Sequence, residues 1–198
     1  MAGGLALFLS GCSEQPAAPA PKKAEEKIEP VTGQSALFKM YQVARTWDPR
    51  IQILKLSSVH VNEVPEVRGK AAEWDGVLIS PTQERARTYS FSVIELLPTL
   101  HKGVFSTAEE AFSGRSGESK PFLIEMAKID SDKAYQTALA KAGDYEKKNP
   151  AKPITLVLEL TPRHPNPAWR VIWGESASTS NFSVYVDAFT GEYLEVMH

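Results

Sequence analysis

The chain has a single cysteine among its 198 residues, which excludes an intrachain disulfide. Basic residues are not in excess: the formal net charge is −2, so there is no positive field to hold nucleic acid or an anionic surface. Hydrophobic residues make up 42% and charged residues 23%, which are usual proportions for a folded protein. The composition predicts one globular domain or two small ones, with no nucleic-acid partner.

Catalytic and metal-binding motifs are also missing. No two of the four histidines have the three-to-five-residue spacing of zinc ligands; they are His60, His101, His164 and His198. The chain has no Gly-x-Ser-x-Gly elbow, no Ser-x-x-Lys motif and no P-loop. We therefore expect a protein that is not an enzyme, with no catalytic residues, no metal site and no cofactor.

Long hydrophobic runs are absent too. The run 5–9 reads Leu-Ala-Leu-Phe-Leu, which is far shorter than the ~20 residues that span a bilayer, but it is typical of the apolar part of a signal peptide. It leads into Leu9-Ser10-Gly11-Cys12, which resembles the bacterial lipobox. The resemblance implies cleavage before Cys12, a signal peptide over 1–11, and a lipid on the Cys12 thiol that anchors the protein to a membrane.

Two features leave alternatives open at this end. The start Met1-Ala2-Gly3-Gly4 has no Lys or Arg, whereas signal peptides begin with positive charge, which a start codon further upstream would supply. The alternative for Cys12 is a free buried thiol.

The run 13–32 is rich in Pro, Ala, Lys and Glu and cannot bury enough apolar area to fold. We expect 12–34 to be a disordered tether in the cell envelope, facing the periplasm or the cell exterior.

Two segments have the periodicity of a helix. In 35–47, Leu37, Met40, Tyr41 and Ala44 share one face. Ser35 is the expected cap and Asp48-Pro49 the expected end. The second helix begins at 130–132 and reaches about Ala142, and Gly143 is its expected stop.

Each predicted helix precedes three strand-like segments, at 51–61, 72–80 and 85–95 and again at 154–160, 169–173 and 182–187. Short matches recur in the same order. Tyr41-Gln42-Val43-Ala44 matches Tyr135-Gln136-Thr137-Ala138, Trp74 matches Trp169, and Phe91-Ser92-Val93 matches Phe182-Ser183-Val184. Alternation of apolar and polar residues predicts antiparallel sheets covered on one side.

The repeat predicts an α+β fold of two units, each a helix packed on an antiparallel sheet of three to four strands. The expected boundaries are 35–106 for the first unit, 107–120 for a linker and 121–198 for the second unit. Within the second unit, 121–128 is expected to be a strand.

The second unit resembles the PepSY module at its helix entry 129–134, in Trp169-Arg170-Val171-Ile172-Trp173, and in its last hairpin, Tyr185-Val186-Asp187-Ala188-Phe189-Thr190-Gly191-Glu192-Tyr193-Leu194. Asp187 suits a turn because it can accept from its own turn backbone, and Gly191 because it can take a positive φ. Asp187, Thr190 and Gly191 are therefore expected to build a structural turn. The first unit lacks the Asp…Thr-Gly turn after Val93-Ile94-Glu95 and is PepSY-like through the repeat alone.

The resemblance implies an envelope protein that binds or restrains a protein or peptide partner, such as a protease or a peptidoglycan-associated enzyme. Trp169 and Trp173 are candidate partner-binding residues, with burial in the core as the alternative. One alternative function is a small-ligand carrier or an enzyme with a pocket between the two units, and another is a purely structural spacer that holds something near the membrane.

Overall fold

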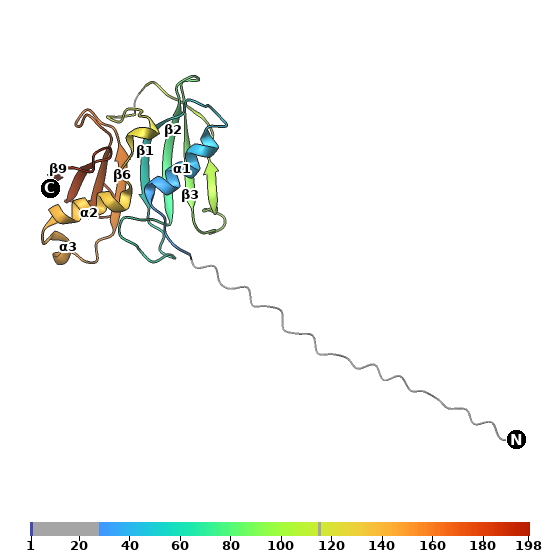
Figure 1. Cartoon of the computed structure of the whole chain (residues 1–198), viewed down its shortest axis with the longest axis horizontal. Helices are drawn as coiled ribbons and strands as arrows, with labels where there is room; N and C mark the ends of the chain where they lie inside the picture. The colour runs from blue at the N-terminus through green and yellow to red at the C-terminus, as the bar shows by residue number, and fades with distance from the viewer. Residues whose placement is uncertain (2–27, 115) are drawn as a thin grey trace.

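The computed structural model of the chain describes Met1, residues 28–114 and residues 116–198. Its described part is one antiparallel sheet of nine strands with two main helices, α1 (Gly33–Ala44) and α2 (Ser131–Ala142), on one face (Figure 1). The α+β class expected from the sequence is confirmed. Leu37 and Met40 turn the apolar face of α1 to the sheet, and both are buried.

The strands follow a simple order. The first four, β1 (Gln52–Val59), β2 (Glu73–Ser80), β3 (Arg85–Ser92) and β4 (Gly103–Ser106), run outward from the middle of the sheet to one edge. The last four, β6 (Ile154–Glu159), β7 (Ala168–Trp173), β8 (Ser183–Asp187) and β9 (Tyr193–Met197), run outward to the other edge. One main helix precedes each set, so the two halves share the order of a helix followed by four strands.

The two sets meet at β1 and β6, which pair antiparallel at the centre of the sheet. Lys55, Leu56 and Ser57 lie opposite Glu159, Leu158 and Val157. The two halves therefore share one hydrogen-bonded sheet and one hydrophobic core. Helix α1 contacts β1 to β4, and α2 contacts β7 to β9.

The short elements lie between these sets. The two-residue strand β5 (Glu110–Ala111) pairs with the start of β3 and falls inside the expected linker. The single turn α3 (Tyr145–Lys148) follows α2. Helix α2 itself matches its expected limits, because Asp130 accepts from the Ser131 N–H at its start and Gly143 has a positive φ of 57° at its end.

The expected strand at 121–128 is wrong. Lys120 bridges Leu160 and Phe122 bridges Ile53, so the chain touches both central strands just beyond their paired stretch. It then turns away as the 3-10 helix η1 (Ile124–Met126). The reason is positional: β1 and β6 already pair with each other and with β2 and β7, so no continuous edge remains for this segment.

Candidate functional site

The junction between the halves is filled by two tryptophans. Trp74 on β2 and Trp169 on β7 are both 0% exposed, and their rings meet edge to face with centroids 6.2 Å apart. Gly33, the first residue of α1, packs against both rings: a Cβ there would lie 2.5 Å from Trp169 Cη2 and 3.1 Å from Trp74 Cη2. No room for a ligand is left between these three residues.

Hydrogen bonds lock the starts of the two helices together beside this pair. The buried Ser131 hydroxyl accepts from the Gly33 N–H at 2.8 Å and donates to the Gly69 carbonyl at 2.7 Å. Asp130 Oδ1 accepts from the Gln34 N–H, and the Gln34 side-chain amide donates to the Ala127 carbonyl. Main-chain groups from three segments of both halves are satisfied at one point, which fixes the halves against each other.

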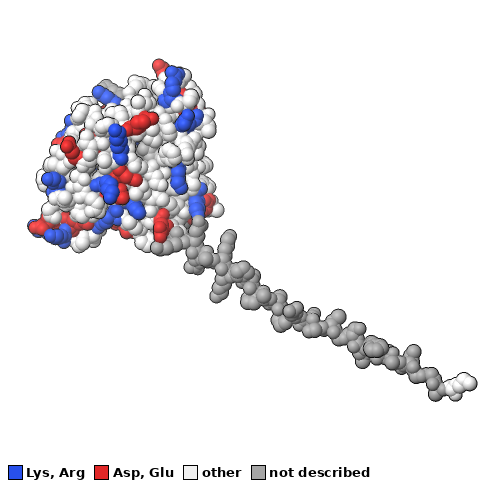
Figure 2. Space-filling model, in the orientation of Figure 1, with Lys and Arg blue, Asp and Glu red and all other residues white. Residues whose placement is uncertain are grey.

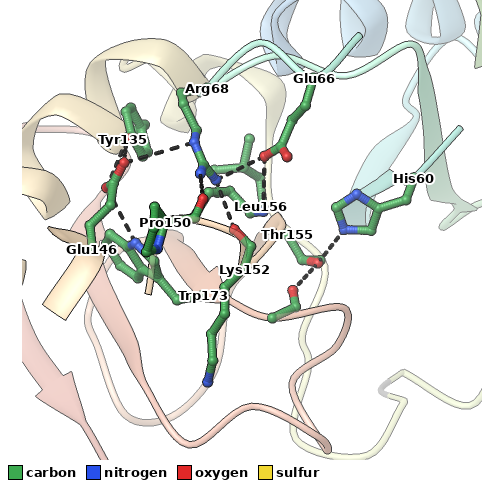
Figure 3. A network of polar contacts seen from close by, with 12 residues as sticks. His60, Glu66, Arg68, Tyr135, Glu146, Pro150, Lys152, Thr155, Leu156 and Trp173 are labelled. Atoms are coloured by element: carbon green, nitrogen blue, oxygen red, sulfur yellow. Dashed lines mark hydrogen bonds and ion pairs between the residues drawn. The ribbon is translucent and has the colours of Figure 1, made fainter. Parts of the chain in front are cut away.

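A polar network extends from the loop before β2 into the second half (Figure 3). The Arg68 guanidinium donates to Glu66 at 2.9 Å, to the Lys152 carbonyl at 3.0 Å and to the Pro150 carbonyl at 3.1 Å. Glu66 in turn accepts from the Ile154 N–H at the start of β6. The rigid fork of the guanidinium suits this task, because it reaches several acceptors at once.

Glu146 on α3 forms the inner end of this network (Figure 3). Its carboxylate lies 3.8 Å from Arg68 Nε, 2.8 Å from the Tyr135 hydroxyl and 3.3 Å from Trp173 Nε1. Burial, together with the hydrogen bond to Glu146, raises the pKa of the Tyr135 hydroxyl far above its usual value, so the phenol stays protonated and donates. Each of these polar side chains is hydrogen-bonded or ion-paired within the protein. We therefore interpret Glu66, Arg68, Tyr135 and Glu146 as a structural clasp between the halves and not as a pair of catalytic groups.

A hollow of about 510 Å³ lies next to the clasp and is lined by both halves. Pro30 and residues 58–62, 64–67 and 70–72 line it from the first half, and Pro153, Ile154 and Glu175 line it from the second. His60 at its rim bonds Thr155 Oγ1 at 2.9 Å, and that hydroxyl donates to the Gly174 carbonyl. This hollow is a candidate site for a small ligand between the halves.

The β9 edge is the second candidate site. In the described part of the chain, β9 pairs only with β8, so its other side is an open edge of the sheet. On the face away from the helices, Glu195 is held by Arg163 at 3.0 Å and lies 3.1 Å from His164. An edge strand of this kind presents unpaired N–H and C=O groups to an incoming chain.

The structure brings together the three turn residues expected in the last hairpin. Asp187 Oδ1 accepts from the Phe189 and Thr190 N–H groups at 2.8 and 2.9 Å, and Gly191 has a φ of 81°. Thr190 Oγ1 accepts from the Glu192 N–H. Burial alone would raise the pKa of Asp187, but the hydrogen bonds from Asn166 and the turn backbone outweigh it and lower the pKa.

The candidate partner-binding residues Trp169 and Trp173 are both 0% exposed and lie in the core. A surface role is not available to them in this fold, because their alternating positions on β7 face the helices. The expected lipidation site Cys12 lies outside the described residues, as does the predicted tether up to residue 27. The remainder of that tether is partly structured: Val31 pairs with Ala71, and α1 begins at Gly33, two residues before the expected cap Ser35.

Neither the Arg68 clasp nor the hollow could be predicted from the sequence. Glu66 and Arg68 lie two residues apart before β2, and only the fold brings Glu146 of α3 within 4 Å of Arg68. In the described ranges, no three His, Cys, Asp or Glu side chains are grouped to hold a metal ion, and none of the helices has the length and hydrophobicity of a membrane span. Figure 2 shows basic and acidic side chains interspersed on the face it draws.

No family model, curated protein or solved structure matches the chain. The likeness to the PepSY module therefore depends on the residues quoted above.

Proposed function

We propose that this protein is a lipid-anchored, non-enzymatic component of the bacterial cell envelope whose body binds a protein or peptide partner by adding a strand at β9. The body consists of two PepSY-like units in one sheet. The observation that carries the proposal is the contrast between a filled junction at Trp74 and Trp169 and an open edge at β9. A carrier would be expected to have a pocket between the halves, and at the two tryptophan rings that space is filled.

The opposite edge of the sheet suits strand addition less well. There β4 has four residues and β5 has two, and both pair with β3, so residues 107–109 interrupt the edge. Strand β9 offers five consecutive residues with α2 alongside. The pairing of β9 with β8 is irregular between Tyr193 and Glu195, but β9 still offers a partner one strand where the other edge offers two short ones.

The two-unit part of the proposal is supported by matching contacts. Trp74 Nε1 donates to the Val31 carbonyl, two residues before α1, and Trp169 Nε1 donates to the Ile129 carbonyl, two residues before α2. Together with the shared order of one main helix before four strands, this supports duplication of one helix-and-sheet unit. The Asp187–Gly191 turn supports the PepSY-like assignment for the second unit.

The lipid-anchor part is supported by Leu9-Ser10-Gly11-Cys12 after an apolar run. Its test is mass spectrometry of the mature protein from its native host. We expect a diacylated N-terminal Cys12 and partition into detergent, and Cys12→Ala should accumulate as an unprocessed precursor. Cys12→Ser is the matched control, since it retains size and polarity but not the thiol. An unmodified Cys12 in the wild-type protein would overturn this part alone.

The partner part is tested by affinity capture from the host's own membranes with the full chain as bait. Glu195→Pro and Val196→Pro form a matched pair, because adjacent residues of an antiparallel strand point their N–H groups to opposite sides. One of the two prolines removes an N–H group that faces the open edge. That variant should fold normally and should not capture the partner that the wild type captures. The other proline should destabilise the β8–β9 pairing. Equal capture by the wild type and the still-folded variant would overturn strand addition.

A carrier or enzyme remains the second candidate, because the hollow is lined by both halves and contains His60, Glu66 and Glu175. If the protein is a carrier or an enzyme, a small molecule should co-purify with it. His60→Ala and Glu175→Ala should then change the binding of that molecule. Under our proposal, native mass spectrometry finds no such molecule, and neither substitution alters partner capture.

A further inference from the structure

Two lysine–aromatic pairs lie where the last hairpin enters the β9 edge. Lys128 Nζ lies 3.7 Å from the ring centroid of Phe189, and Lys141 Nζ lies 5.2 Å from that of Tyr193. The rings are 39% and 38% exposed, and both lysines are exposed. The pairs therefore combine apolar surface with two positive charges beside the open edge.

These ammonium groups are well placed to receive carboxylates. A cation over an aromatic face gains from the ring quadrupole, but the ring offers no lone pair, so the N–H donors still turn to an acceptor. Two of the nearby carboxylates are committed elsewhere: Asp187 accepts from its own turn, and Glu195 is held by Arg163 on the face away from the helices. Glu192 is the remaining exposed acidic residue of this hairpin.

The register of β9 sets which side chains of an added strand would meet these lysines. Tyr193 lies opposite Val186, which is buried in the core on the helix side. Tyr193 is therefore on the helix side as well, with Lys141 of α2 above it. An added strand points alternate side chains to that side, so one side-chain set passes Tyr193 and Lys141.

We infer that the segment added at β9 is acidic on its helix-facing side, at the end that lies beside Tyr193 and Phe189. This inference rests on the proposed function and specifies the partner's chemistry. Its carboxylates pair with Lys128 and Lys141, while the aliphatic parts of the same side chains cover the two rings.

The test uses three fluorescein-labelled decapeptides with Val at alternate positions and Glu, Gln or Lys at the others. Fluorescence anisotropy with the full chain in detergent gives each affinity at low and high salt. We expect the Glu peptide to bind about three- to tenfold more tightly than the Gln peptide, since exposed ion pairs contribute modestly. The advantage should shrink at high salt through screening.

The variant Lys128→Glu/Lys141→Glu should reverse the preference toward the Lys peptide, and Lys128→Gln/Lys141→Gln should remove it. The matched control is Lys39→Glu/Lys70→Glu in the first half, where Lys39 also lies over an aromatic ring, that of Phe91. The control should retain the preference for the Glu peptide. Equal affinities for all three peptides, or no binding of any, would overturn the inference. The proline pair at 195 and 196 tests the proposed function independently.

Discussion

Trp74 and Trp169 hold corresponding places in the two halves, and their rings touch across the centre of the sheet. Each indole donates to a carbonyl two residues before the helix of its own half. The same contact thus sets the start of both helices, and Gly33 is enclosed where the two rings approach.

We predict that Gly33→Ala destabilises the protein by about 1–3 kcal/mol, because its Cβ would overlap the Trp169 ring in a packed core. Thermal unfolding followed by circular dichroism measures the loss. The control is Gln42→Ala on the exposed side of the same helix, which should change stability by no more than about 0.5 kcal/mol. Similar melting temperatures for the two variants would contradict the tight packing at Gly33.

Asp48 should make stability depend on pH in acid. It is buried, and burial alone raises its pKa, but hydrogen bonds from Ser80, Thr82 and the Arg50 N–H outweigh this and lower the pKa from 3.8 to about 2. A lowered folded pKa means that the stabilisation is complete above about pH 4 and is lost as the pH falls toward 2.

Asp48→Asn should therefore cost about 2 kcal/mol near neutral pH, the usual value of a hydrogen bond to a charged group. Denaturant unfolding at a series of pH values should show this difference narrowing between pH 4 and 2. Asp144→Asn on the exposed turn after α2 is the control. A difference that is constant with pH would rule out Asp48 as the titrating group.

Gly191→Ala should destabilise the last hairpin by about 1–2 kcal/mol. The φ of 81° disfavours any side chain, and the added Cβ would lie 3.2 Å from Ile129 Cδ1. Gly191→Asn should cost less than its size suggests, since Asn tolerates this backbone region better. Urea unfolding of the three proteins measures the order, and an Ala variant as stable as the wild type would show that the turn adjusts.

Arg68→Met should loosen the clasp between the halves. The substitution keeps the apolar stem but removes the donors to the Pro150 and Lys152 carbonyls and the partner of Glu146. We expect a loss of about 1–3 kcal/mol and faster hydrogen exchange in 61–70 and 146–154. Arg68→Lys should retain only part of the wild-type stability and protection from exchange, because one ammonium group cannot reach all these acceptors.

Arg45→Met, at the exposed end of α1, is the control for the clasp. It removes the same charge without touching the second half. If hydrogen exchange in residues 61–70 is the same in Arg68→Met as in the wild type, then the loop is held by its apolar contacts alone.

Local signals in the sequence were enough for much of the fold. The limits of α2 can be predicted because the residues that set them, Asp130 at its start and Gly143 at its end, lie directly at the helix ends. The alternation at 85–93 and 154–160 likewise marks β3 and β6, and the Asp187–Gly191 turn has its chemistry in five consecutive residues. In each case the residues that decide the structure are neighbours in sequence.

The pairing between distant segments could not be predicted from the sequence. Nothing in the sequence near Leu56 or Leu158 indicates that β1 and β6 lie side by side, because the same apolar alternation suits any central strand. The turn at 124–126 follows from that pairing, and so do the clasp and the hollow. The tryptophans on β7 were ambiguous for a similar reason: one apolar face serves a core or an interface equally well until the opposing layer is known.

The central pairing also has a kinetic consequence. Ser58 on β1 accepts from the Leu156 N–H on β6, 98 residues further along the chain. During synthesis from the N-terminus, the first half is complete while one side of β1 still lacks its neighbour. Such a long-range pairing forms late and slowly, because a large loop must close before it contributes. Until then β1 is a temporary edge open to wrong partners, and a chaperone that shields this strand would raise the yield of folded protein.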